Sequence, residues 1–260
     1  MVNNKKIGLA LSGGGALGVA HIGAIEEVEK AGIEIDYISG VSSGAIMGLA
    51  YAVGGLDSLH KFYDNAIGNF GKKNKLLFAK GADGAFEYIR WALADLCRGG
   101  EFNQLKIPFS CCATNLATGE REVFNSGDPV AAVMASSAYP GVFAAQKINN
   151  KFYIDGGATR NLPAEEVRAA GADFVIGSSI YAVDRIADEK AGKINRIEIA
   201  ARAMDIIQKE LSRFEEKQCD FCFKPPSAQY RWFDFFKMEE ILNQGRENAR
   251  RQIKNLLPLL

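Results

Sequence analysis

Residues 7–28 read IGLALSGGGALGVAHIGAIEEV, and residues 35–53 read IDYISGVSSGAIMGLAYAV. In each stretch a short apolar run leads into a glycine-rich turn, after which apolar residues recur at helical spacing. Both stretches therefore predict a strand, a tight loop and a helix. Further apolar runs predict strands over residues 107–114, 120–124, 146–148, 152–154 and 174–178. Alternating strands and helices predict a three-layer α/β/α sandwich around a mostly parallel sheet, with ligands at the carboxyl ends of the strands.

Charge and length narrow the class of protein. The chain has 260 residues, with 31 basic and 31 acidic side chains, so it lacks the basic surface of a nucleic-acid binder and we expect no nucleic acid as partner. Residues 7–25, 37–56 and 129–146 carry no charge, but the glycines and turn residues inside them suit a buried sheet better than a membrane span. We expect one domain over residues 1–260.

Composition changes over residues 56–100, which mix lysines and aromatic residues and interrupt the strand–helix alternation. A mobile cover over a lipid pocket would have this composition, and so would a small helical subdomain of fixed structure. Helical spacing returns over residues 197–214 and 238–256 and closes the chain.

The cysteines and the N-terminal residues indicate the cellular compartment in which we expect the protein to lie. Cys111 and Cys112 are adjacent and poorly placed to bridge each other, and the total of five is odd. Cys219 and Cys222 spell C-x-x-C without a second pair, so we expect strand cysteines and no metal site. No secretory cleavage pattern follows the first apolar run. We expect a cytoplasmic protein that makes peripheral contact with the membrane.

The first glycine loop fits more than one function. Gly13, Gly15 and Gly18 fit G-x-G-x-x-G after a strand, which is a dinucleotide-binding pattern. The acidic residue that this pattern requires is missing at the end of the next strand, because Asp36 lies at that strand's start. What remains is a loop of backbone amides at a helix N-terminus. Such a loop can bind an anion, including an oxyanion formed in a transition state.

The second glycine loop, residues 40–44, fits G-x-S-x-G between a strand and a helix, so Ser42 is the candidate nucleophile. The simpler reading is a Gly/Ser turn that binds nothing. His21 and His60 are the two histidines, and their order excludes the α/β-hydrolase arrangement of serine, acid and histidine. Asp155, followed by two glycines at the end of a strand, is the best available base, although it could instead cap a hairpin through an Asx turn.

Four motifs occur in order: GGGALGVAHIG (residues 13–23), GVSSG (40–44), ASSAYPGVF (135–143) and DGG (155–157). Together they resemble the patatin-like phospholipase family, and the resemblance covers residues 5–170. It implies a Ser-Asp dyad of Ser42 and Asp155, with an oxyanion hole formed by Gly13, Gly14 and Gly15. Leu17 stands where the family usually has a basic residue.

The residues and the family resemblance together predict a serine lipid acyl hydrolase of the phospholipase A or lysophospholipase type. It would cleave carboxylic esters of membrane lipids through an acyl-enzyme, without cofactor or metal. A transacylase would share the same residues. Two other classes stay open: a catalytically silent lipid-binding or interaction protein, and, less favoured, a nucleotide-binding oxidoreductase. The oligomeric state also stays open.

Overall fold

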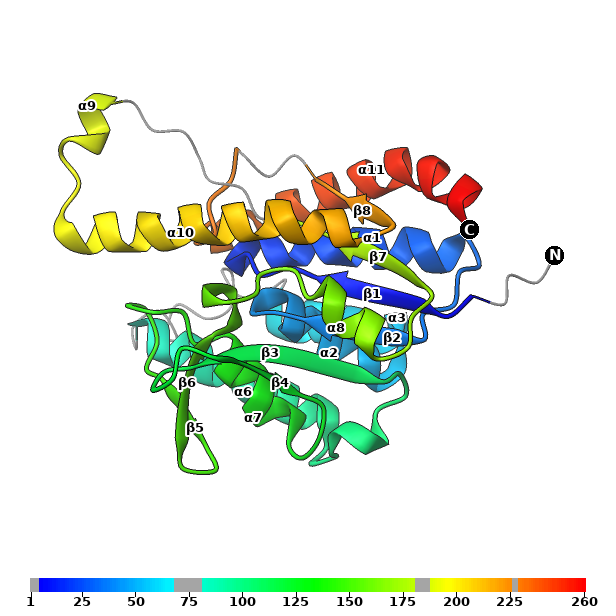
Figure 1. Cartoon of the computed structure of the whole chain (residues 1–260), viewed down its shortest axis with the longest axis horizontal. Coiled ribbons are helices and arrows are strands. Elements are labelled where there is room, and N and C mark those ends of the chain that lie inside the picture. The colour runs from blue at the N-terminus through cyan, green and yellow to red at the C-terminus, as the bar shows by residue number, and fades with distance from the viewer. Residues whose placement is uncertain (1–4, 68–80, 181–187, 226–228) are drawn as a thin grey trace.

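The structure is a computed structural model that describes residues 5–67, 81–180, 188–225 and 229–260. Its centre is a sheet in the order β5-β6-β3-β2-β1-β7-β8, with β4 also paired to β3 (Figure 1). From β3 to β8 the neighbouring strands are parallel, whereas β4, β5 and β6 pair antiparallel at one side. The predicted α/β/α fold with a mostly parallel sheet is confirmed. The strands are β1 (Ile7–Leu11), β2 (Tyr37–Gly40), β3 (Phe109–Asn115), β4 (Arg121–Phe124), β5 (Gln146–Ile148), β6 (Lys151–Asp155), β7 (Phe174–Ser178) and β8 (Phe221–Phe223).

Helices cover both faces of the sheet. Successive side chains of a strand point to opposite faces, and in β1 Leu9 and Leu11 join the main core whereas Ala10 packs with the smaller core under α8 (Figure 1). The main core also contains side chains of α1, α2, α6, α7 and α11. The described helices are α1 (Ala20–Lys30), α2 (Ser43–Gly54), α3 (Leu56–Phe62), α6 (Gly81–Cys97), α7 (Pro129–Ser136), α8 (Ala164–Ala169), α9 (Asp188–Ala191), α10 (Arg196–Glu215) and α11 (Met238–Leu256).

The pairing of β3 brings distant parts of the chain together. β4 pairs with residues 111–114 of β3, so β2 and β6 must share the other edge. β2 occupies that edge up to Gly40, opposite Cys111, and β6 takes over with Asp155 opposite Ala113. Because β6 is antiparallel to β3, its last residue, Asp155, lies next to the point where β2 ends and the turn of Ser42 begins.

The segment over residues 56–100 is described in part. α3 and α6 pack on the core through Leu59, Phe62, Phe86 and Leu93, all of which are buried. Phe86 stacks on Phe143 with 4.3 Å between ring centroids. These two helices therefore form a packed cover on the sheet's main-core side. The part of the predicted lid over residues 68–80 lies outside the described residues.

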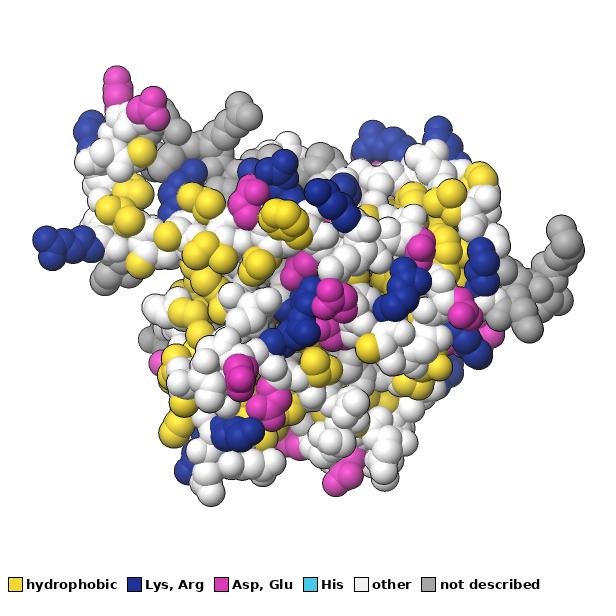
Figure 2. Space-filling view, viewed as in Figure 1, with side chains coloured by type: hydrophobic (Ala, Val, Ile, Leu, Met, Phe, Trp, Pro, Cys, Tyr) yellow, Lys and Arg dark blue, Asp and Glu magenta, His cyan; other side chains and the backbone are white. Residues whose placement is uncertain are grey.

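Helix α10 turns polar side chains inward and apolar side chains outward. Gln208, Ser212 and Glu215, spaced along one face, are buried, whereas Ile206 and Ile207 are 47% and 51% exposed. Figure 2 shows apolar side chains along this helix at the surface. This arrangement is the reverse of an ordinary surface helix. Within the described ranges, no helix is long and apolar enough to cross a membrane.

Candidate active site

Ser42 occupies a strained turn between β2 and α2. Its φ of 52° lies in a region that residues other than glycine seldom adopt, which is typical of a nucleophile elbow. The turn is tight because the flanking residues lack side chains. A Cβ at Gly44 would come within 2.4 Å of the Leu11 carbonyl oxygen, and one at Gly40 within 2.5 Å of the Gly44 carbonyl oxygen. The G-x-S-x-G spacing therefore permits the close approach that exposes the Ser42 hydroxyl.

Asp155 lies at the end of β6 and is fully buried. Burial raises its pKa to about 6, although the nearby Ser42 hydroxyl and the Gly157 amide both lower it. Oδ1 accepts a hydrogen bond from the Gly157 amide at 2.8 Å, whereas Oδ2 has no hydrogen-bond partner among the described residues. Asp155 therefore has an oxygen free to accept a proton near neutral pH. The predicted Asx turn is present, but it caps the short 3-10 helix Gly156–Ala158 that follows β6 and not the β5–β6 hairpin.

The glycine loop follows β1 and faces the elbow. The Gly13 amide donates to the Asn161 carbonyl oxygen at 3.1 Å, so this amide is already engaged. The amides of Gly14 and Gly15 donate to no described residue. The Ser43 amide is the first of α2 and has no acceptor within that helix. Of the three glycine amides expected to form an oxyanion hole, the second and third are available to a ligand.

Asn161 connects this loop to helix α10. Its side-chain Nδ2 donates to Ser212 Oγ at 2.7 Å, and its backbone amide donates to the Glu215 carboxylate at 3.1 Å. Arg160 Nη1 lies 3.5 Å from the same carboxylate, yet burial outweighs this pairing and raises the pKa of Glu215 to about 7. The position of Gly13 therefore depends on a buried polar network of the C-terminal part of the chain.

Neither histidine takes part in the site. His21 Nε2 lies 2.9 Å from the Ser12 carbonyl oxygen, which can only accept, so Nε2 carries the proton. Its Nδ1 lies 2.8 Å from Ser178 Oγ, and burial lowers the His21 pKa to about 4. The ring is therefore neutral and structural. His60 pairs with Glu26 at 2.8 Å and lines neither cavity at Ser42.

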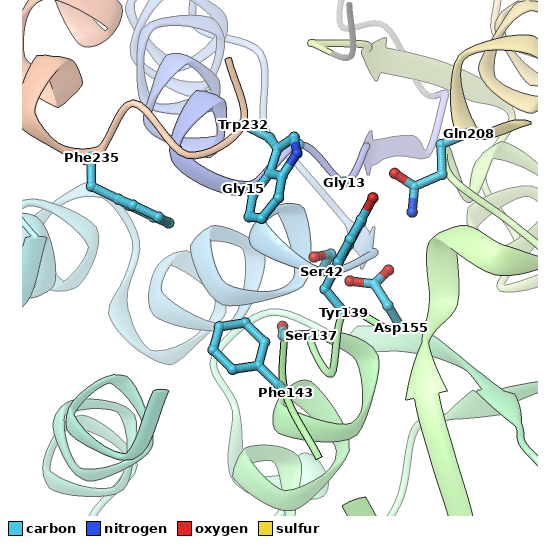
Figure 3. A pocket seen from close by; sticks show the side chains of 11 residues that line it. Gly13, Gly15, Ser42, Ser137, Tyr139, Phe143, Asp155, Gln208, Trp232 and Phe235 are labelled. Atoms are coloured by element: carbon cyan, nitrogen blue, oxygen red, sulfur yellow. The ribbon is translucent and has the colours of Figure 1, made fainter. Parts of the chain in front are cut away.

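Two cavities meet at Ser42. The larger, of about 340 Å³, is lined mainly by apolar side chains, among them Ile46, Phe86 and Ile89. The smaller, of about 50 Å³, contains Asp155 and the glycine loop, and its lining side chains converge on Ser42 in Figure 3. The residues that line both cavities are Gly15, Ser42, Ser137, Phe143, Trp232 and Phe235. Ser42 thus lies between a large apolar chamber and a smaller cavity that contains the Asp155 carboxyl group.

The structure places several side chains at the site for which the sequence predicted no role. Ser136 accepts the Ser42 amide through its Oγ at 3.0 Å, and Tyr139 stacks on Trp232. Ser136 and Tyr139 lie within the motif of residues 135–143, so the sequence indicated this motif but not the contacts of these two side chains. Gln208 and Trp232 lie in the C-terminal region, which contains no motif. The polar face of α10 is the one feature of the sequence that could have indicated a role for Gln208.

No group of three or more potential metal-ligating side chains occurs in the part of the chain that the structure describes. Cys222 Sγ lies 3.7 Å from the Phe223 carbonyl oxygen, and its contact with the Cys219 thiol, followed by burial, raises its pKa. The thiol of Cys219 lies beside it and bonds to the Glu215 carbonyl oxygen. Both sulfurs pack against Gly177 of β7.

The order of the motifs matches a known family. The model of the patatin-like phospholipase family matches residues 9–168, which is more than half of the chain. The chain belongs to the patatin-like phospholipase family. The resemblance stated from the four motifs is therefore confirmed, and membership of the patatin-like family supports a lipid hydrolase function.

Individual relatives agree with this placement. An uncharacterized NTE family protein of Mycobacterium tuberculosis is 33% identical over 180 residues, which are 68% of this chain and 50% of that protein. Lysophospholipase NTE1 of Eremothecium gossypii is 26% identical over 281 residues, covering 94% of this chain and 18% of that protein. The chain thus spans half or less of the length of these two relatives.

Solved structures show the same fold. VipD from Legionella pneumophila matches with a TM-score of 0.52 at 14% identity, covering 96% of this chain and 67% of that one. Human GIVD cytosolic phospholipase A2 matches with a TM-score of 0.51 at 10% identity, covering 98% of this chain and 59% of that one.

Proposed function

We propose that the chain is a serine lipid acyl hydrolase of the phospholipase A or lysophospholipase type, acting through a dyad of Ser42 and Asp155. The observation that carries the proposal is the pairing of a strained, cavity-facing serine with a buried carboxyl group. The Asp155 pKa of about 6 suits a base that works near neutral pH. The amides of Gly14 and Gly15, and that of Ser43, donate to no described residue, and these three residues line the cavities at Ser42, which supports an oxyanion hole; the Gly13 amide holds the loop in place.

In the first half-reaction Asp155 removes the proton of the Ser42 hydroxyl, and Oγ attacks the ester carbonyl carbon. The free amides stabilise the negative charge on the carbonyl oxygen. When the tetrahedral intermediate collapses, the bond to the leaving alcohol breaks. Asp155 then donates its proton to that alcohol, leaving an acyl group on Ser42.

The substrate class follows from the cavity and the family. An apolar chamber of about 340 Å³ beside the nucleophile suits a fatty acyl chain. Phe86 and Ile89 of α6 line it, so the packed cover forms one wall of the acyl site. We propose a phospholipid or another lipid ester as substrate. A transacylase would pass through the same acyl-enzyme and differ only in the acceptor of the acyl group.

Contact with a lipid surface is the second part of the proposal. Ile206 and Ile207 are exposed on α10, and Gln208 of the same helix lines the small cavity. A bilayer against this face would bury the exposed apolar side chains close to the site. Replacing Ile206 and Ile207 by Ser should weaken sedimentation with phosphatidylcholine vesicles several-fold. Hydrolysis of a soluble ester should stay unchanged, and unaltered sedimentation would refute this contact.

A fluorophosphonate tests the dyad most directly. The human phospholipase that shares this fold is known in complex with methyl γ-linolenyl fluorophosphonate. We expect the same reagent to add to Ser42, as a mass shift on the peptide that contains it, with no adduct in Ser42→Ala. Ser43→Ala is the matched control and should label normally, because its proposed contribution is the backbone amide. Failure of the folded protein to label would favour a silent lipid-binding protein.

A further inference from the structure

The two cavities at Ser42 differ in what they can hold. The small one has a volume of about 50 Å³, which suits a few water molecules and is too small for an acyl chain. Asp155, Tyr139 and Gln208 line the small cavity and are absent from the lining of the large one. With an acyl chain in the large cavity, the small one is the place from which water can reach the acyl carbon.

Gln208 is a buried amide in the small cavity. It is 3% exposed, and no hydrogen bond joins its side-chain amide to any described residue. Its Nε2 lies so close to Gly157 that a Cβ there would come within 2.3 Å of it. Figure 3 shows the amide on the Asp155 side of Ser42, opposite the ring of Phe143. A buried amide without a partner is unfavourable unless it binds something that enters the cavity.

Apart from Asp155, the neighbouring polar side chains are already engaged or belong to both cavities. Tyr139 donates its hydroxyl to Asp205 Oδ1 at 2.7 Å. Ser137 lines both cavities, so an acyl chain in the large one lies against it as well. Gln208 is therefore the polar side chain best placed to hold a molecule beside Asp155 after the acyl-enzyme has formed.

We infer that Gln208 binds and orients the water that hydrolyses the acyl-enzyme. This inference rests on the proposed function. Asp155 accepts one proton of this water while the water oxygen forms a bond to the acyl carbon. The tetrahedral intermediate then collapses, the bond from the acyl carbon to Ser42 Oγ breaks, and Asp155 returns the proton to Oγ. Gln208 gains or loses no proton, and acts by holding the water through its amide.

The experiment separates formation of the acyl-enzyme from its hydrolysis. Excess enzyme is mixed with p-nitrophenyl butyrate in a single turnover. Release of p-nitrophenol reports acylation, and loss of the butyryl mass on Ser42 reports deacylation. Gln208→Met keeps the length of the side chain without its amide. We expect deacylation to slow about 10- to 100-fold while acylation stays within about threefold of the wild type.

The controls separate this role from a structural one. Lys209→Met changes the next residue of α10, which is exposed, and should leave both rates unchanged. Gln208→Ala leaves space for the water without an amide, and should slow deacylation as Gln208→Met does. Deacylation at the wild-type rate in both Gln208 variants would overturn the inference. Equal loss of acylation and deacylation would also overturn it, because it would indicate a disturbed site.

The same measurements distinguish failure of this inference from failure of the proposed function. If Ser42→Ala keeps its turnover, or if no acyl mass ever appears on Ser42, the dyad itself is wrong. If Ser42 is acylated and Ser42→Ala is inactive, but Gln208 variants deacylate normally, only the role of Gln208 is wrong.

Discussion

Replacing Asp155 by Asn should make the protein more stable and nearly inactive. Burial raises the pKa of this carboxyl from 3.8 to about 6, so the folded state holds the ionised form unfavourably. Two pKa units correspond to about 3 kcal/mol. Asn is neutral at every pH and keeps an oxygen for the Gly157 amide. It should therefore remove this unfavourable term.

The size of this stability gain depends on pH. Above about pH 6 Asp155 is ionised in both states, and the folded state bears the full penalty of about 3 kcal/mol. Below about pH 4 it is protonated in both states, and the penalty disappears. The stability gained by Asp155→Asn should thus be about 3 kcal/mol at pH 8 and roughly half of that at pH 5. Urea unfolding at both pH values measures it, with Asp57→Asn, an exposed position, as control.

Activity should change in the opposite direction. Loss of the base should lower kcat for p-nitrophenyl butyrate by about 10² to 10⁴. In the wild type, kcat/KM should rise as pH increases towards about 6 and level off above it, because the ionised carboxylate is the active form. A stability difference that is the same at pH 5 and pH 8 would refute the raised pKa. An Asp155→Asn variant that turns over at the wild-type rate would refute the role of base.

Four further predictions concern the rest of the site. Gly44→Ala should destabilise the protein by more than about 1 kcal/mol and abolish turnover, as followed by urea unfolding and ester hydrolysis, since its Cβ would meet the Leu11 carbonyl. His21→Gln and His60→Gln should keep ester hydrolysis within about tenfold of the wild type; an inactive, folded variant would make that histidine the base. Activity on a soluble ester should persist in excess EDTA, and loss restored by calcium would contradict the metal-free mechanism. If α6 belongs to a mobile lid, its amide hydrogen exchange should change when vesicles are added, whereas equal protection would indicate a fixed wall.

Local sequence patterns specified much of this protein. Helices and strands begin and end close to the predicted residues because glycine turns and apolar spacing act over a few neighbours. Helix α11 has the predicted bounds, whereas β2 and β3 are displaced by one or two residues, since pairing with neighbouring strands sets where a strand ends. The order of the four motifs was sufficient to identify the family.

Contacts between distant segments could not be read in the same way. That Asp155 lies beside Ser42 follows from the register of β3, which exchanges β2 for β6 along one edge. The packing of helix α10 decides two further features of the site. It positions Asn161, whose carbonyl oxygen accepts the Gly13 amide, and it places Gln208 in the small cavity. A sequence pattern indicates which face of a helix is apolar, and an apolar face is normally buried. In α10 the polar face is buried instead, so the pattern does not predict how this helix packs. The motifs therefore determined the fold and the candidate nucleophile and base, whereas tertiary packing decided which amides and side chains surround them.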